Sequence, residues 1–220
     1  MKKITLIETI SDWLMSDNAG DLKGKYHPSI ISTWLNSAFN QSIYNAWLNG
    51  KKYSDFSQLD AWSKVHECSI ENQTGTDAYA FLPFAPVQLS DGMGIREVSD
   101  HADNTNVFAP IEATSNVVFA ALEVDTMDST PTYRLLQNNL NTGAGEKSHM
   151  LKLERMPTGA DAIISVDVMM IVPLDQTDDY DDVTMPAGGE DILIRQVLDL
   201  MSKKPAPDIA NDNVPQPSIS

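Results

Sequence analysis

The histidine and cysteine side chains are the first candidates for metal binding or catalysis. The chain has histidines at positions 27, 66, 101 and 149 and a single cysteine, Cys68. His66 and Cys68 alternate along a predicted strand, but they supply only two ligands, whereas a structural zinc site has four. We therefore expect no metal site. A single cysteine also excludes a disulfide within the chain, which fits a reducing cytoplasm.

The motifs of common enzymes and cofactor sites are missing from the sequence. It has no serine elbow, no phosphate-binding glycine loop with its lysine and no dinucleotide fingerprint, and Gly92-Met93-Gly94 has the pattern of a turn. Asn72-Gln73-Thr74 matches a glycosylation acceptor, but no export signal accompanies it. We therefore predict a protein without catalytic residues or cofactors. One alternative stays open: a hydrolase whose catalytic residues are far apart in the sequence and meet only in the folded protein.

An acidic run lies near the C-terminal end of the sequence. Asp178, Asp179, Asp181 and Asp182 fall within the segment Asp175–Asp182. A helix-flanked calcium loop needs a central glycine and a closing glutamate, and this segment has neither. The run therefore predicts a solvated acidic loop rather than a cation site.

The overall charge limits the partners that the chain can have. It contains 31 acidic and 15 basic residues, for a net charge of −16. Proteins that grip DNA neutralise its phosphates with lysine and arginine, and no basic block is present here. The acidic balance fits a highly soluble monomer with no special partner. It would also let DNA slide past without specific binding if the protein lined a conduit for DNA. No apolar run approaches the roughly 20 residues that span a bilayer, and Glu8 and Asp12 interrupt a signal-like start, so we expect neither membrane contact nor export.

Two helices are predicted in the N-terminal part of the chain. The first covers Thr5–Ser16, where Thr5 and Glu8 have the spacing of a capping box. The second begins at Pro28, which suits a first helical turn, and is expected to stop at Asn49-Gly50. The apolar positions with helical spacing are Leu6, Ile7, Ile10, Trp13 and Leu14 in the first helix, and Ile30, Ile31, Trp34, Leu35, Ala38, Phe39, Ile43, Trp47 and Leu48 in the second.

The middle of the chain changes to the alternating pattern of strands. Strands are expected at Trp62–Ile70, Ala78–Phe84, Met93–Val98, Asn116–Val124, Thr132–Leu136, Met150–Arg155 and Asp161–Pro173. In the last, one face must be buried and the other can be partly buried. Ile164, Val166, Val168, Met170 and Val172 point to one face, and Ser165, Asp167, Met169 and Ile171 to the other. Such strands with turns between them predict an antiparallel β-sandwich or barrel-like domain.

A third helix and a polar tail follow the strands. Glu190 and Asp191 suit the N-terminus of a helix that ends at Lys203-Lys204. The tail beyond it contains prolines, no glycine and no aromatic residue, so it cannot fold alone. Its isolated apolar residues Ile209, Val214 and Ile219 suit contacts with a neighbouring subunit, although a frayed end is an equal alternative.

These elements together predict an α+β protein. We expect an N-terminal helical hairpin over residues 1–52 and a β domain over residues 53–186. A C-terminal helix should cover residues 187–204, and a flexible or partner-docked tail should cover residues 205–220.

Three stretches resemble the neck ring, or head-to-tail connector, proteins of short-tailed bacteriophages, in particular crAss-like phages. They are the opening helical pair, Leu82–Leu89 with Gly94–Val98, and Met185–Leu198, together about a third of the chain. The resemblance implies a virion protein without catalysis, made in the bacterial cytoplasm. It implies a homo-oligomeric ring of about twelve copies below the portal. Such a ring would continue the DNA channel and contact the portal and other neck or tail proteins.

A ligand-binding or glycan-binding β-sandwich with a helical appendage is the alternative. Such a protein would expose aromatic residues such as Trp62, Tyr79 or Tyr133 around a concave site. A closed oligomer would favour the ring, and a monomer that binds sugar would favour this alternative. A monomer alone decides nothing, because ring subunits can wait for the portal as a template.

Overall fold

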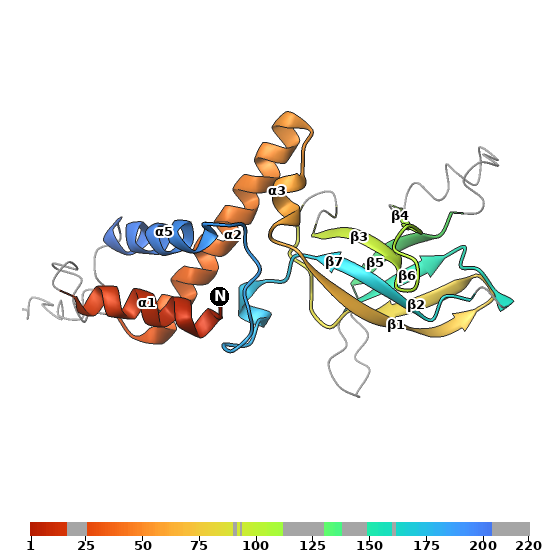
Figure 1. The fold of residues 1–220 in the computed structure, drawn as a ribbon, viewed down its shortest axis with the longest axis horizontal. Helices are drawn as coiled ribbons and strands as arrows, with labels where there is room; N and C mark the ends of the chain where they lie inside the picture. Colours follow the sequence, from red (N-terminus) through yellow and green to blue (C-terminus); the bar gives the residue numbers. More distant parts are fainter. Residues whose placement is uncertain are drawn as a thin grey trace, which may run out of the picture.

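The chain folds into a helical body and a barrel-like sheet that lie end to end (Figure 1). The computed structural model describes residues 1–16, 26–89, 92, 94–111, 130–137, 149–159 and 162–203. The helices are α1 (Lys3–Met15), α2 (Pro28–Tyr53), α3 (Ser57–Asp60) and α5 (Gly189–Lys203), with the short 3₁₀ helix η5 (Leu174–Gln176). The strands are β1 (Lys64–Thr74), β2 (Asp77–Phe81), β3 (Ile95–Asp100), β4 (Ala109–Pro110), β5 (Thr132–Gln137), β6 (His149–Glu154) and β7 (Ser165–Met170). The predicted α+β class with a barrel-like domain and a C-terminal helix is confirmed.

The sheet is mixed and nearly closed. Its strand order is β3-β7-β1-β2-β6-β5-β4, and every pair is antiparallel except β4 with β5. The two edges approach each other because the chain turns back after β3: the Phe108 amide donates to the Val98 carbonyl at 2.8 Å, and β4 follows at once. A parallel pair needs a connection of a dozen or more residues, which 111–131 supply. The expected strand Asn116–Val124 falls within this connection and lies outside the described residues.

Strand β7 is the centre of one half of the sheet. It pairs with β1 on one side and with β3 on the other, and its alternate residues Val166, Val168 and Met170 are fully buried. The predicted burial of these three is therefore confirmed. The strand is shorter than predicted because Ile164 is 82% exposed and Ile171 leaves the sheet to join the helical core.

The N-terminus of α1 is held in a different way from the one predicted. The expected capping box of Thr5 and Glu8 is wrong: α1 begins at Lys3, no side chain caps it, and Thr5 lies within the helix. Its first amides are satisfied instead by the acidic segment, since the Lys3 amide donates to the Asp181 carbonyl and the Ile4 amide to the Asp179 carbonyl. The carboxylates of this segment are exposed, as predicted, but its backbone anchors the helix.

Helix α2 begins as predicted and ends later. Pro28 occupies the first turn, and the His27 side chain accepts a hydrogen bond from the Ser29 amide. The predicted stop at Asn49-Gly50 is wrong, because the helix continues to Tyr53 and Ser54 takes the left-handed conformation that ends it. A Cβ on Gly50 would collide with the Phe56 ring. Glycine is therefore required at position 50 for close packing, not for termination.

Two hydrophobic clusters form the interior. One lies between α1, α2, α3 and α5, so the C-terminal helix completes the bundle that the N-terminal helices begin. The other fills the barrel-like sheet. Among the described helices, none is long and apolar enough to cross a membrane.

Candidate functional site

The residues singled out for metal chemistry are dispersed. Cys68 is 2% exposed in the barrel core, whereas His101 lies at the exposed end of β3 and His149 begins β6. Within the described ranges, no three histidine, cysteine, aspartate or glutamate side chains are placed to hold a metal ion.

The Cys68 thiol is chemically protected. Burial raises its pKa to about 11, with smaller contributions from the charges of Asp167 and Glu67. Because the thiolate is the reactive form, alkylation of the folded protein by iodoacetamide at neutral pH should be about 100-fold slower than in the unfolded chain. Mass spectrometry of labelled protein with and without denaturant checks this, and equal rates would show that the strand opens readily.

His101 forms a small acidic cluster on the outer surface of the sheet. Its Nδ1 lies 2.9 Å from an Asp167 carboxylate oxygen, and its Nε2 lies 3.8 Å from a Glu67 oxygen. The hydrogen bond to Asp167 is the main cause that raises the pKa of His101, followed by the charges of Asp167, Glu67 and Asp100. Because the cluster is exposed, we assign it only a contribution to the stability of the neighbouring strands β1, β3 and β7.

The His101 cluster predicts a specific pH dependence. Since folding raises the pKa above its ordinary value of about 6.5, the protonated histidine stabilises the fold below that pH, and the contribution is lost as the pH rises through the folded-state pKa. NMR titration should show Asp167→Asn lowering the His101 pKa more than the matched Glu67→Gln. The opposite order would contradict the assigned geometry.

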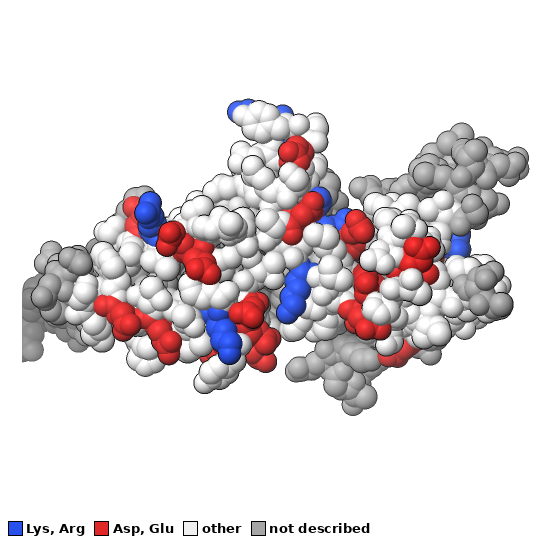
Figure 2. All heavy atoms as spheres, viewed as in Figure 1, with Lys and Arg blue, Asp and Glu red and all other residues white. Residues whose placement is uncertain are grey.

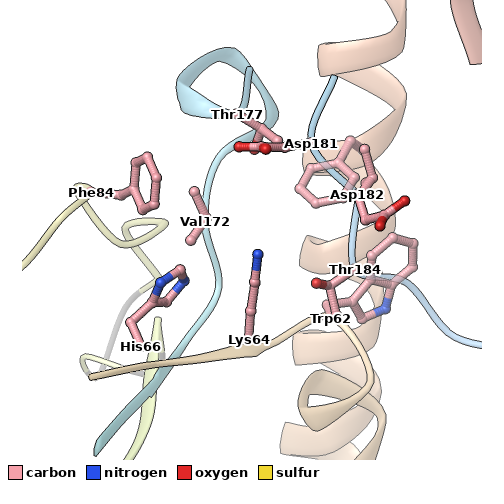
Figure 3. A pocket seen from close by; sticks show the side chains of 11 residues that line it. Trp62, Lys64, His66, Phe84, Val172, Thr177, Asp181, Asp182 and Thr184 are labelled. Atoms are coloured by element: carbon pink, nitrogen blue, oxygen red, sulfur yellow. The ribbon is translucent and has the colours of Figure 1, made fainter. Parts of the chain in front are cut away.

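A small cavity lies at the junction between the helical body and the sheet (Figure 3). It has a volume of about 40 Å³. Lys64 and His66 project into it from β1, opposite Asp181 and Thr177. Burial, and then the charge of Lys64, lowers the pKa of His66. A few water molecules fit this space, but ligand pockets are about ten times larger.

A larger open groove, of about 510 Å³, runs between α2, α3 and the first half of α5. The hydroxyl of Ser42 donates to the Gln196 carboxamide at 2.9 Å and joins the two long helices there. The lining combines hydroxyl and carboxamide side chains with apolar ones. The lining residues are Ser42, Asn45, Ala46, Asn49, Ser57, Gln58, Ala61, Trp62, Pro186, Ile192 and Gln196.

Helix α2 also has an exposed aromatic face beyond the groove. Tyr44 and Leu48 are 49% and 42% exposed, and the Tyr44 ring lies 5.5 Å from that of Trp47. At about 100° per residue, Tyr44 and Leu48 point roughly 130° away from the groove residues of the same helix. The helix therefore has three faces: one in the core, one in the groove and one aromatic.

The aromatic residues expected of a glycan site do not form one. Trp62 and Tyr133 are each 7% exposed, so their predicted exposure is wrong, and Tyr79 is half-buried on β2. Trp62 instead packs edge to face against Phe39, with ring centroids 5.3 Å apart. Sugar recognition through these three rings would need exposed faces.

The stretches that carry the phage resemblance meet in space. The segment 82–89 crosses from the barrel core, where Leu82 lies, to the helical core, where Val87 packs. Arg96 pairs with Asp60 at 2.7 Å and ties β3 to α3. The predicted assembly residues Ile209, Val214 and Ile219 lie outside the described residues. Comparison of the chain with protein-family models, curated proteins and solved structures found no match.

Proposed function

We propose that the chain is a structural subunit of a bacteriophage neck. Many copies form a closed ring below the portal, continue the DNA channel and anchor tail components. The observation that carries this proposal is the division of the α2 surface into an uncharged groove and a separate aromatic face. The sequence resemblance described above supplies the class of assembly.

A closed ring requires two different complementary surfaces on each subunit. Head-to-tail contacts close when a patch on one copy binds a distinct patch on the next. Exposed Tyr44 and Leu48 form one such patch, and tyrosine is among the side chains that interfaces favour. The groove on another side of the same helix provides the second patch. The two surfaces support assembly better than catalysis.

The charge of the chain suits a channel for DNA. Figure 2 shows acidic side chains over both the helical end and the barrel end of one face, with fewer basic ones. Together with the net charge of −16, this surface repels phosphates, so DNA would pass without being held. Micromolar retention of duplex DNA at physiological salt would count against this role.

Cryo-electron microscopy and native mass spectrometry of particles that contain the chain test the proposal. We expect a ring of about twelve copies adjoining the portal. Leu48→Asp should prevent incorporation because it places a charge in the aromatic face. The matched variant Ile164→Asp, at an isolated site that is 82% exposed, should not. Density outside any ring, or equal incorporation of both variants, would refute this assembly.

A further inference from the structure

None of the residues that line the groove between α2 and α5 is charged. Charged residues make up 21% of the sequence, yet the eleven residues that line the groove include none. Its carboxamides both donate and accept hydrogen bonds, which is what an extended peptide backbone requires. Trp62, Pro186 and Ile192 add apolar surface. The groove therefore suits an uncharged extended peptide better than an ion or nucleic acid.

The chain contains a segment with matching chemistry. Residues 213–220 read Asn-Val-Pro-Gln-Pro-Ser-Ile-Ser and carry no charged side chain. Pro215 and Pro217 favour an extended backbone, which lowers the entropy lost on binding. Val214 and Ile219 supply apolar anchors, while the Gln216 carboxamide can pair with those of the groove. Neither the groove nor the segment has to desolvate a charged side chain on binding.

The link between α5 and this segment favours a neighbouring copy over the chain's own groove. Residues 204–212 span about 30 Å when extended, while the 15-residue α5 is about 22 Å long. Ile192 and Gln196 line the groove from the first half of α5, so the chain's own segment would have to reverse direction within this link. Pro205 and Pro207 disfavour such a reversal, because proline-rich segments extend.

We propose that the groove binds residues 213–219 of a neighbouring copy of this chain. The inference rests on the proposed ring, which places copies side by side. Each copy would give its segment to one neighbour and receive the segment of another. Individually weak peptide contacts would then be strengthened by the subunit interface, which holds each segment at high effective concentration.

Disulfide trapping between full-length chains tests this contact. Asn49→Cys chains would be mixed with Ser218→Cys chains under mild oxidation, and the linked heterodimer measured by mass. The control mixture replaces Asn49→Cys with Asn40→Cys. Both are exposed asparagines of α2, but they point in opposite directions about the helix axis. We expect about tenfold more heterodimer with Asn49→Cys, and the buried Cys68 should not compete.

Each outcome decides the proposal. Adding Val214→Asp and Ile219→Asp to the Ser218→Cys chain should remove the excess heterodimer. Equal yields in the two mixtures would overturn the assignment. So would a double variant, Asn49→Cys with Ser218→Cys, that closes within one chain at a rate independent of concentration, because the groove would then hold the chain's own segment.

Separate experiments test the proposed ring and the proposed groove contact, so one proposal can be refuted while the other stands. Native mass spectrometry of the unmodified chain with its portal reports on the ring alone. A selective disulfide without a ring would remove the proposed function and leave the groove as a contact between two copies. A ring without the selective disulfide would remove only the groove assignment.

Discussion

Replacing Phe39 with alanine is expected to lower the free energy of unfolding by about 4 kcal/mol. Phe39 is 2% exposed and packs edge to face against Trp62. It also lines the small cavity between the helical body and the sheet. Because the surrounding residues come from different elements, they cannot collapse fully into the vacated space, and the cavity term adds to the lost burial. Denaturant unfolding followed by circular dichroism measures the change.

Tyr44→Ala on the same helix is the control for this variant. Tyr44 is 49% exposed, so its replacement should change the free energy of unfolding by no more than about 0.5 kcal/mol. If the ring proposal holds, the same variant should weaken assembly while leaving the fold intact. A Phe39→Ala variant as stable as Tyr44→Ala would show that the Phe39 ring is not tightly packed against Trp62.

The long elements were predictable because their apolar spacing is regular. The burial of Leu6, Ile10 and Leu14 follows directly from a period near 3.6 in α1. In the same way, alternation in β7 identified its buried face, and Glu190 and Asp191 marked the start of α5. Such patterns repeat over several turns or residue pairs of one element, so the element and its buried face can be predicted without knowledge of the tertiary fold.

The helix ends were harder to predict because tertiary contacts decide them. The start of α1 depends on carbonyl groups of Asp179 and Asp181, which lie far away in the sequence. Gly50 looks like a stop signal, but the Phe56 ring occupies the space where its side chain would be. The capping-box spacing and the Asn-Gly stop signal are both sound local rules. In each case, however, a contact from outside the helix determined where the helix begins or ends.

The parallel pairing of β4 and the groove were also hard to predict, because both depend on elements that are distant in the sequence. Ala109–Pro110 is too short to show alternation, and only its pairing with β5 makes it a strand. The groove depends on bringing Asn45 and Asn49 of α2 beside Ile192 of α5. An available signal was the row of uncharged polar residues at helical spacing on α2, which differs from the charged face usual for an exposed helix.

Gly94→Ala is expected to cost about 3 kcal/mol, which corresponds to a fall in melting temperature of about 9 °C. A Cβ at this buried position would overlap the carbonyl oxygen of Val87, a backbone atom that cannot rotate away. The backbone here is bound on both sides, because the Ile171 amide donates to the Gly94 carbonyl and the Val87 amide donates to the Ile171 carbonyl, each at 2.9 Å. Moving Gly94 would therefore strain two hydrogen bonds at the junction of the helical body and the sheet.

Gly75→Ala separates this steric effect from the general cost of replacing glycine. Gly75 has a φ of +63°, and nothing lies within 4 Å of the position that an added methyl group would take, so alanine there costs only the left-handed backbone, about 1 kcal/mol. Calorimetry of both variants should show the larger loss at Gly94, although Gly94 lacks a positive φ. An equal loss would mean that segment 82–89 moves freely against β3. The rigid connection that a ring subunit needs between its helices and its barrel would then be missing.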